Sequence, residues 1–449
     1  MLCFFTFGLM LSWFDIALTS FYALVIFAWM FYSRFFHLAG LHPRFSVIAF
    51  SVKIISGFLL TWIYTAYYDD RSQSDIFKFF DDSKYIYQAL EHKPADFFSM
   101  VFGLDQNRPY YDQYYYQMSN WFKSYDSSLF NDTRTMIRLN AFIRLFSFGV
   151  YHVHTLFFSL LTFLGLIFIY KAMYRWFADR TLLLALSLFL MPSVLCWTSG
   201  VLKEAVLFLG LGFLLYGLSS CYSGKLNWKS IKFILPGVLL MLVVKPYILA
   251  ALIPGVIALI SFSRIKGGRI GFHFAGVYAL SAIAFWLLAQ LEPQYNILEQ
   301  LSERQQSVQR LAFYVDSGSL VYAAPLNPNI WSLLRNLPEA LINAAFRPSI
   351  LDADNSLKWL AAFENLLIII ILVFCIGLFK YDPKKLAVWL FLMSFVFIVY
   401  ALSGLTTPVL GTLVRYRVPA LPFFMMLMFM MMDYERLKRI LNETFGKIE

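Results

Sequence analysis

Residues 358–402 read KWLAAFENLLIIIILVFCIGLFKYDPKKLAVWLFLMSFVFIVYAL. They contain two apolar runs, 358–379 and 386–402, which are separated by a short turn with three lysines. A helix needs roughly 20 mostly apolar residues to cross the hydrocarbon core of a membrane. The stretch therefore predicts two consecutive membrane-spanning helices joined by a basic turn.

The same pattern recurs along the chain, which is 60% hydrophobic and only 14% charged. The strands of a membrane β-barrel would alternate apolar and polar residues over about 10 positions, whereas the apolar runs here are continuous. The sequence predicts an all-α polytopic membrane protein with about eleven transmembrane helices in a single integral membrane domain, 1–449. The expected spans are 12–33, 46–67, 151–171, 181–198, 204–220, 231–246, 247–263, 270–291, 358–379, 386–402 and 414–432.

Clusters of lysine and arginine lie in the short connections on one side of these spans. Such clusters favour the cytoplasmic side, so we predict that this side is cytoplasmic, the C-terminal tail 433–449 included, and that the odd number of spans places the N-terminus outside. The formal net charge of +10 is then mostly a topology signal and does not predict a nucleic-acid partner. The clusters comprise Arg34, Arg44, Lys171, Arg175, Arg180, Lys225, Lys229, Lys232, Arg264, Lys266, Arg269, Lys380, Lys384, Lys385, Arg436, Lys438 and Arg439.

Two long segments on the opposite side, 68–150 and 292–357, are polar enough to carry function. The first begins with several aspartates and continues to a tyrosine-rich stretch, and the second contains several arginines. Carboxylates gather in the first segment, while cations recur at the other outer turns. This division suits a site that removes a proton from one group and holds a phosphate elsewhere.

Residues 74–90, SDIFKFFDDSKYIYQAL, predict an amphipathic helix on the outer membrane surface, with Asp75 in its first turn. Asp75 and Asp82 fall on its polar face, from which the carboxylates would turn toward water or a cavity. In a purely structural interpretation, Asp75 caps the helix and Asp82 pairs with Lys78. Asp69 and Asp70 follow directly after a span, and they also suit a simple membrane boundary.

Several charged residues lie in or beside apolar runs, where an unpaired charge is costly by a few kcal/mol. Lys203 and Glu204 form a tight turn between two short spans, and Lys245 precedes Pro246 in another apolar run. These residues either form a site or pair with buried groups and brace the fold. The same question applies to Glu364, within a predicted span, and to the outer arginines Arg415 and Arg417, whose guanidinium groups suit phosphate but also snorkel at helix ends.

Five local stretches resemble bacterial envelope-polysaccharide membrane proteins, and the arrangement as a whole resembles the GT-C-fold glycosyltransferases, which use polyprenyl-phosphate-linked sugars. The resemblance covers about a fifth of the chain, and none of its motifs is a strict catalytic signature. Related sequences often have Gly where this chain has Ser74, and Arg where it has Lys245. The stretches are SDIFKFFDDSKYI, PSVLCWTSGVLKEAVLFLGLGFLLYG, VVKPYILAAL, NAAFRPSILDADNSLKWLAAFEN and TLVRYRVPALPF.

The resemblance implies a sugar transfer on the outer face of a membrane, expected to be the bacterial inner membrane. The acceptor, whether a glycan, a lipid or a protein, must lose a proton, and the leaving lipid phosphate must be stabilised. We expect Asp75 to be the base, with Asp82 or Asp81 as the second choice. The expected phosphate ligands are Lys203, Arg415 and Arg417, with help from Lys245 or Arg347. The expected supporting residues are Glu204, Asp69, Asp70 and Glu364.

No residue spacing demands a metal or another cofactor, although aspartate pairs could hold a divalent ion. A lipid-linked polysaccharide polymerase or ligase is an alternative function, in which the arginines of 292–357 form the centre. A transporter or flippase for lipid-linked oligosaccharides would require charges within several spans and repeat symmetry. A non-catalytic scaffold within an envelope complex is the fourth possibility.

Overall fold

The computed structural model describes residues 12–67, 71, 74–104, 108–122, 131–222, 227–265, 269–314, 319–321 and 323–445. Over these residues the protein is helical and has no β-strand, only two isolated bridges. The chain divides into two compact units, each of which is described by itself. Unit 1 comprises 1–172, 195–218 and 227–246, and unit 2 comprises 173–194, 219–226 and 247–449.

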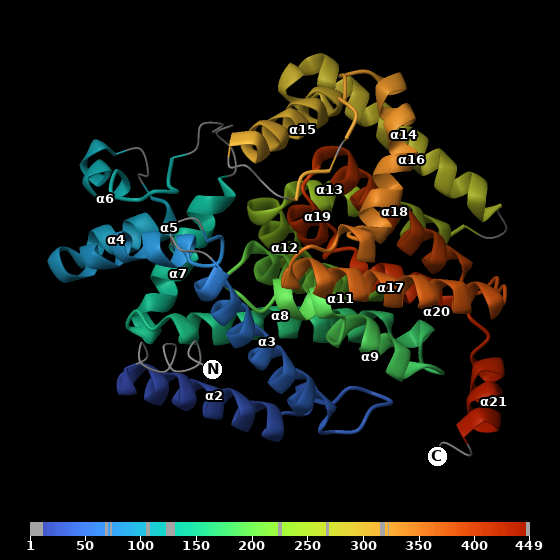
Figure 1. Cartoon of the computed structure of the whole chain (residues 1–449), viewed down its shortest axis with the longest axis horizontal. Coiled ribbons are helices and arrows are strands. Elements are labelled where there is room, and N and C mark those ends of the chain that lie inside the picture. Colours follow the sequence, from blue (N-terminus) through green and yellow to red (C-terminus); the bar gives the residue numbers. More distant parts are fainter. Residues whose placement is uncertain are drawn as a thin grey trace. The chain divides into compact units, whose positions relative to one another are not determined.

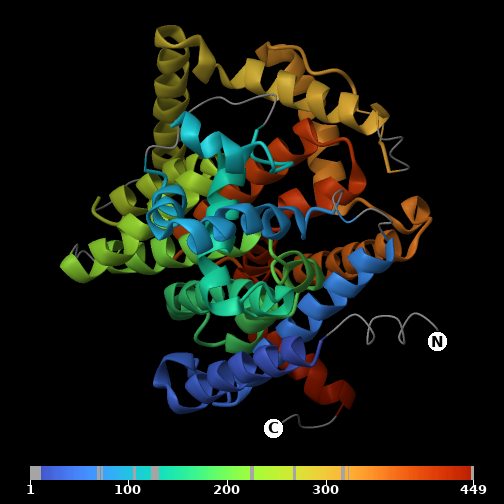
Figure 2. The same cartoon turned by 90° about the vertical axis from the view of Figure 1, so that its left-hand side faces the viewer.

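Unit 1 contains the helices that precede residue 173 and two later ones. Its outlying helices α2 and α6 lie at opposite ends of this unit in both cartoon views (Figures 1 and 2). The helices are α2 (Trp13–Tyr32), α3 (Phe45–Tyr67), α4 (Lys78–His92), α5 (Pro94–Phe102), α6 (Asp112–Tyr115), α7 (Asp132–Ser147), α8 (Tyr151–Met173), α11 (Lys203–Tyr222) and α12 (Trp228–Val244).

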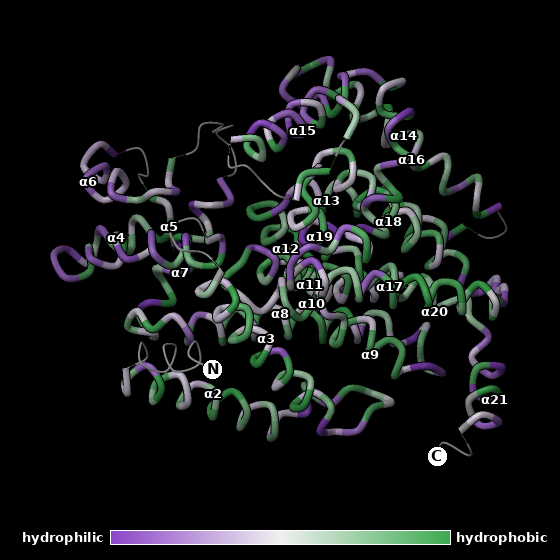
Figure 3. The backbone as a smooth tube through the Cα atoms, in the orientation of Figure 1, coloured by the Kyte–Doolittle hydropathy of each residue, from purple (hydrophilic) through white to green (hydrophobic). Residues whose placement is uncertain are grey.

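Unit 2 contains one α-helix before residue 190 and the α-helices from residue 246 onward. Within it, the hydrophilic α15 and the C-terminal α21 lie at opposite ends, while α20 is hydrophobic (Figures 1 and 3). The helices are α9 (Thr181–Phe189), α13 (Pro246–Phe262), α14 (Ile270–Leu291), α15 (Ile297–Tyr314), α16 (Ile330–Phe346), α17 (Ser356–Gly377), α18 (Leu386–Thr406), α19 (Leu410–Arg417), α20 (Leu421–Met430) and α21 (Tyr434–Phe445). The short α10 (Pro192–Trp197) crosses the boundary between the units.

Seven helices of the described chain are long and apolar enough to cross a membrane, or eight if the bent pair α19 and α20 counts as one span. This confirms the all-helical polytopic class, whereas the expected number of eleven spans is not confirmed. The seven are Trp13–Tyr32, Phe45–Ala66, Tyr151–Trp176, Lys203–Tyr222, Ile270–Leu291, Lys358–Gly377 and Leu386–Thr406.

The other four expected spans take different forms, and prolines and short lengths explain most of the difference. The stretch 181–198 is divided into α9 and α10, and Pro192 begins α10, a position at which its missing N–H breaks no hydrogen bond of the helix. Helices α12 and α13 have 17 residues each, or about 25 Å at 1.5 Å per residue. The last expected span bends by 60° between α19 and α20.

Small residues allow the apolar helices to approach closely within each unit. In unit 1, a side chain on Gly165 of α8 or Gly212 of α11 would collide with the backbone of the other helix. In unit 2, a side chain on Gly404 of α18 would collide with the backbone of α16 at Ala340. Close contact through small residues is the usual basis of helix association in membranes, where burial of apolar surface gives little driving force.

The two long polar segments are themselves folded. The segment 68–150 holds α4 to α7, and α4 packs on both α5 and α7. The segment 292–357 holds α15 and α16, and both pack on α18. Their side chains are therefore positioned by rigid helices, which a binding site needs.

Candidate functional site

Asp75 lies in the turn that leads into α4, and the helix itself begins at Lys78. The expectation that Asp75 occupies the first turn of the helix is therefore wrong. Its carboxylate pairs with the ammonium group of Lys78, and the two side chains are 42% and 26% exposed, respectively. The carboxylate is fixed in place yet reachable from solvent, as a proton acceptor must be.

A second ion pair joins two helix beginnings. Lys203 is the first residue of α11, Asp132 is the first residue of α7, and their side chains form a salt bridge. The Lys203 side chain is 14% exposed and that of Asp132 is 30% exposed. Asp132 is favoured by the positive end of its helix dipole, whereas Lys203 is disfavoured by its own. Lys203 therefore depends on a nearby anion.

The buried ring of Phe79 connects the two pairs. The Lys78 and Lys203 ammonium groups lie 5.2 and 5.3 Å from the centroid of this ring. The two cations are thus no farther apart than roughly twice that distance. We call Asp75, Lys78, Lys203 and Asp132 around this ring the Phe79 group. Cation–π attraction contributes about 0.5–1 kcal/mol at exposed sites, so the ring helps to place both ammonium groups.

The residue that follows Lys203, Glu204, forms a buried ion pair with Lys245. Glu204 is fully buried, and its Oε1 accepts a hydrogen bond of 2.9 Å from Nζ of Lys245, whose side chain is 7% exposed. Glu204 stands in the first turn of α11 and Lys245 caps the C-terminus of α12, so both helix dipoles favour the charges. The geometry of this buried pair favours the bracing interpretation over a role in phosphate binding.

The other aspartates of α4 are held by protein groups. Asp81 forms two hydrogen bonds with the Arg71 guanidinium, of 2.9 and 3.1 Å. Asp82 is buried and accepts hydrogen bonds from the backbone of Ser119 and from the backbone and side chain of Asn120. The expectation that Asp82 faces water or pairs with Lys78 is wrong, because Asp82 lies on the packed side of the helix. Burial raises the pKa of the Asp82 carboxyl, and the hydrogen bonds oppose that rise.

Two buried cations of unit 1 were not singled out from the sequence. Arg144 of α7 donates hydrogen bonds of 2.7 Å to the Ser83 hydroxyl and the Phe80 carbonyl, and burial lowers its pKa to about 10. Lys53, within the membrane-spanning α3, is 1% exposed and donates to the hydroxyl of Thr198 at 2.6 Å. A lysine within an apolar helix is itself a sequence signal of a polar contact.

In unit 2, Arg417 at the end of α19 is fully buried. It donates to the carbonyls of Ala344, Ala345 and Arg347, at 2.9–3.3 Å, and to the Asn365 side chain. The three carbonyls lie at the C-terminus of α16, where a cation complements the helix dipole. We call this arrangement the Arg417 clamp, and it favours a bracing role over binding of a ligand.

The Arg347 side chain forms a two-point ion pair with Asp352 and is 33% exposed. This ion pair holds the pKa of Asp352 well below its usual range. Arg347 also lines a small hollow in unit 2, together with Asn343 and Thr407. A guanidinium can hold an anionic group, and here that group is the Asp352 carboxylate.

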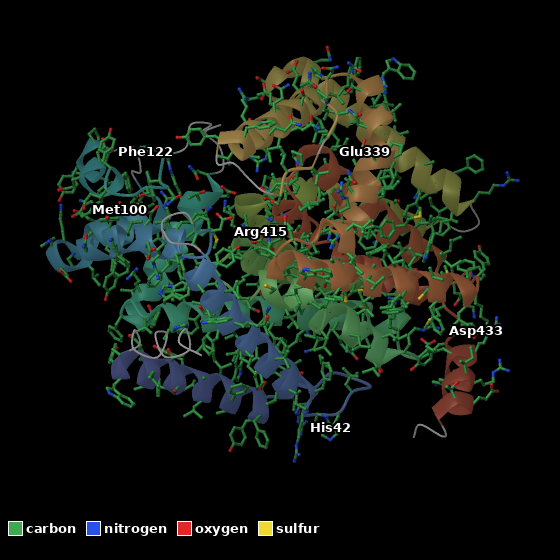
Figure 4. All side chains as sticks on the ribbon, in the orientation of Figure 1. His42, Met100, Phe122, Glu339, Arg415 and Asp433 are labelled. Carbon is green, nitrogen blue, oxygen red and sulfur yellow. The ribbon has the colours of Figure 1, made fainter. Side chains whose placement is uncertain are left out.

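Of the other expected site residues, Glu364 and Arg415 lie on helices of unit 2. Glu364 of α17 is buried and accepts hydrogen bonds from the backbone and the hydroxyl of Ser193. Arg415 is a half-buried residue of α19 (Figure 4). Asp69 and Asp70 lie outside the described residues. No group of three or more potential metal-ligating side chains occurs in the part of the chain that the structure describes.

The expected site residues therefore do not all belong to one unit of the structure. Asp75 and Lys203 belong to one group in unit 1, with Asp132 as a member that the sequence did not indicate. Arg415 and Arg417 belong to unit 2, so their convergence with Lys203 stays a prediction. Comparison of the chain with protein-family models, curated proteins and solved structures gives no match.

Proposed function

We propose that the protein is a membrane glycosyltransferase that moves a sugar from a polyprenyl-phosphate-type carrier to an acceptor on the outer face of the membrane. The observation that supports this most is the Phe79 group. It combines a reachable carboxylate with two ammonium groups on one aromatic ring, in a unit rich in apolar helices. A transfer of this kind needs both a proton acceptor and cations for a phosphate.

In the proposed reaction, the acceptor hydroxyl transfers its proton to Asp75 while its oxygen forms a bond to the anomeric carbon of the sugar. The bond from that carbon to the carrier phosphate breaks, and the electron pair leaves with the phosphate oxygen. Lys203 and Lys78 stabilise the negative charge that grows on this oxygen. Only a charge that develops during the reaction gives such stabilisation a catalytic effect.

The ion pair between Lys203 and Asp132 is compatible with this role. Both side chains keep part of their surface exposed, and an exchange of one anionic partner for another keeps the Lys203 charge paired. A phosphate oxygen can therefore replace Asp132 as the partner of Lys203 at little cost. The buried pair of Glu204 and Lys245 holds the beginning of α11, and thus Lys203, in position.

The membrane arrangement of this proposal follows the basic clusters of the sequence. We propose that the shorter apolar helices also cross the membrane, which gives about eleven spans, and that 68–150 and 292–357 face the outside of a bacterial inner membrane. The C-terminal tail then lies in the cytoplasm. Within unit 2, the position of α15 and α21 at opposite ends supports this arrangement (Figures 1 and 2). The acceptor class stays open among glycan, lipid and protein.

A second candidate function is a lipid-linked polysaccharide polymerase or ligase, and the hollow beside Arg347 favours it. In that reaction, the Arg347 side chain, which is 33% exposed, would contact the diphosphate, and the segment 292–357 would be the centre. A transporter would need charges within its spans, and two candidates for that role, Glu364 and Lys245, are both held by protein partners. We therefore favour an enzyme over a transporter.

Binding of undecaprenyl phosphate to the detergent-purified protein tests the proposal. Loss of a charge-assisted contact costs about 1.5–3 kcal/mol, so Lys203→Gln should weaken binding at least about tenfold. Lys229→Gln is the matched control, because Lys229 is an exposed lysine of α12 in the same unit. Equal binding by wild-type protein and Lys203→Gln would refute the phosphate role of the Phe79 group.

Release of free carrier from lipid-linked sugars, extracted from the source membranes, then tests the base. Asp75→Asn should bind undecaprenyl phosphate as wild-type protein does but release no carrier. If Asp75→Asn is fully active while Arg347→Gln is inactive, the second candidate function replaces the first.

A further inference from the structure

The C-terminal helix α21 (Tyr434–Phe445) follows the apolar α20 after only three residues, Met431 to Asp433. The Asp433 carboxylate accepts from the backbone N–H of Arg436 at 3.2 Å and so caps the helix (Figure 4). The Asp433 backbone N–H donates to the Leu378 carbonyl at 2.7 Å, at the end of α17. The helix is therefore attached directly to the ends of two apolar helices.

Helix α21 has two unlike sides. At 3.6 residues per turn, Tyr434, Leu437 and Ile440 share one side, and all three are half-buried. The Arg180 guanidinium lies 5.5 Å from the Tyr434 ring, so the first turn is docked on unit 2. Figure 3 shows the resulting mixture of hydrophobic and hydrophilic positions, which α20 lacks.

The three cations of α21 are all exposed, but they differ in position. Arg436 and Lys438 fall at the two edges of the apolar side, whereas Arg439 falls on the opposite side of the helix. Cations at both edges of an apolar strip can extend toward lipid phosphates while the strip contacts acyl chains. Arg439 points away from the apolar side and therefore cannot contact lipid phosphates in this way.

We infer that α21 lies in the membrane interface and binds anionic lipid head groups through Arg436 and Lys438. Its attachment to apolar helices brings it to the membrane surface, and its basic edges complement anionic lipid. Two more lysines, Lys380 and Lys384, are exposed in the turn between α17 and α18, and Lys380 contacts Asp433 at 3.5 Å. This inference is independent of the proposed enzymatic function.

Hydrogen exchange of the α21 amides in the full-length protein tests this binding. The protein is placed in nanodiscs of phosphatidylcholine alone or of phosphatidylcholine with an equal amount of phosphatidylglycerol. We expect exchange of the α21 amides to be slower by about tenfold or more in the anionic discs, because each edge cation contributes about fivefold. High salt should reduce the difference, since it screens exposed charges.

Arg436→Gln and Arg439→Gln form a matched pair of variants, because they remove the same charge from the same helix and Gln is nearly as good a helix former as Arg. Arg436→Gln should reduce the effect of anionic lipid by about fivefold, and Arg439→Gln should reduce it by less than twofold. Equal effects of the two substitutions would contradict the assignment to the edge cations. Equal exchange in both kinds of disc would overturn the inference and leave the apolar side of α21 to a protein partner.

Discussion

The Phe79 group in unit 1 and the Arg417 clamp in unit 2 both place a cation among packed helices, but the partners of the two cations differ in charge and in exposure to solvent. Lys203 is partly exposed and faces a carboxylate that is also exposed. Arg417 is fully buried and is surrounded by carbonyls and one amide oxygen of the protein. A cation with exchangeable partners can hold a ligand, whereas one whose partners are the backbone carbonyls of a helix C-terminus stabilises that end of the helix.

The largest effect is expected at the Arg417 clamp. Arg417→Met leaves the carbonyls of the α16 C-terminus and the Asn365 side chain without their donor, and removal of one partner from a buried polar network costs about 3–5 kcal/mol. Thermal unfolding in detergent measures the loss. Arg335→Met is the control, because Arg335 is exposed on the same helix α16 and should change stability by no more than about 0.5 kcal/mol. A fully stable Arg417→Met protein would show that the clamp does not brace unit 2.

Glu204→Gln should have the next largest effect. It leaves Lys245 as a buried cation without its counter-ion, and we expect a loss of about 3 kcal/mol. The double variant Glu204→Gln with Lys245→Met removes both charges and should recover much of that loss. If the double variant is as unstable as the single one, the ion pair is not the reason for the instability.

Lys203→Gln should change the unfolding free energy by only about 1 kcal/mol, because Asp132 is 30% exposed and water can hydrate its carboxylate when the ammonium group is removed. The contrast with Arg417→Met sharpens the comparison, because both residues were expected to bind phosphate. A loss of unfolding free energy at Lys203 as large as that at Arg417 would show that both cations serve to stabilise the fold.

The smallest expected effect is a pH dependence at Asp82. Its pKa is raised by burial, so the folded protein binds this proton more tightly than the unfolded chain does. The contribution of Asp82 to stability therefore falls as pH rises from the unfolded pKa through the raised folded pKa. The stability of Asp82→Asn relative to wild-type protein should increase between pH 4 and pH 7, as followed by thermal unfolding. A relative stability that decreases over this range would contradict the assigned direction.

The helical membrane class could be predicted from the sequence because apolar runs of about 20 residues have one structural solution in a membrane. The structures of the runs 181–198 and 414–432 were harder to predict. A run can be apolar throughout, and yet its helix can end before a proline or bend between two short helices. Sequence hydropathy does not record either event.

Parts of the site could also be anticipated. Glu204, Lys245 and Glu364 were recognised as charges that need partners, and each has one. Asp132 was missed because it lies 71 residues from Lys203 in the sequence and no local pattern connects them. The burial of Asp82 was missed because its helical spacing matches that of the polar face, while the packing of α4 on α7 determines which side is covered.

Photo-crosslinking with a polyprenyl phosphate that carries a diazirine beside the phosphate identifies the residues that surround the carrier phosphate. The probe is added to the full-length protein in nanodiscs, and the labelled residues are identified by mass spectrometry. We expect labels on 75–79 and around Lys203, and competition by unlabelled undecaprenyl phosphate. Labels confined to the hollow around Asn343 and Arg347, with none near Phe79, would show that the phosphate does not bind at the Phe79 group.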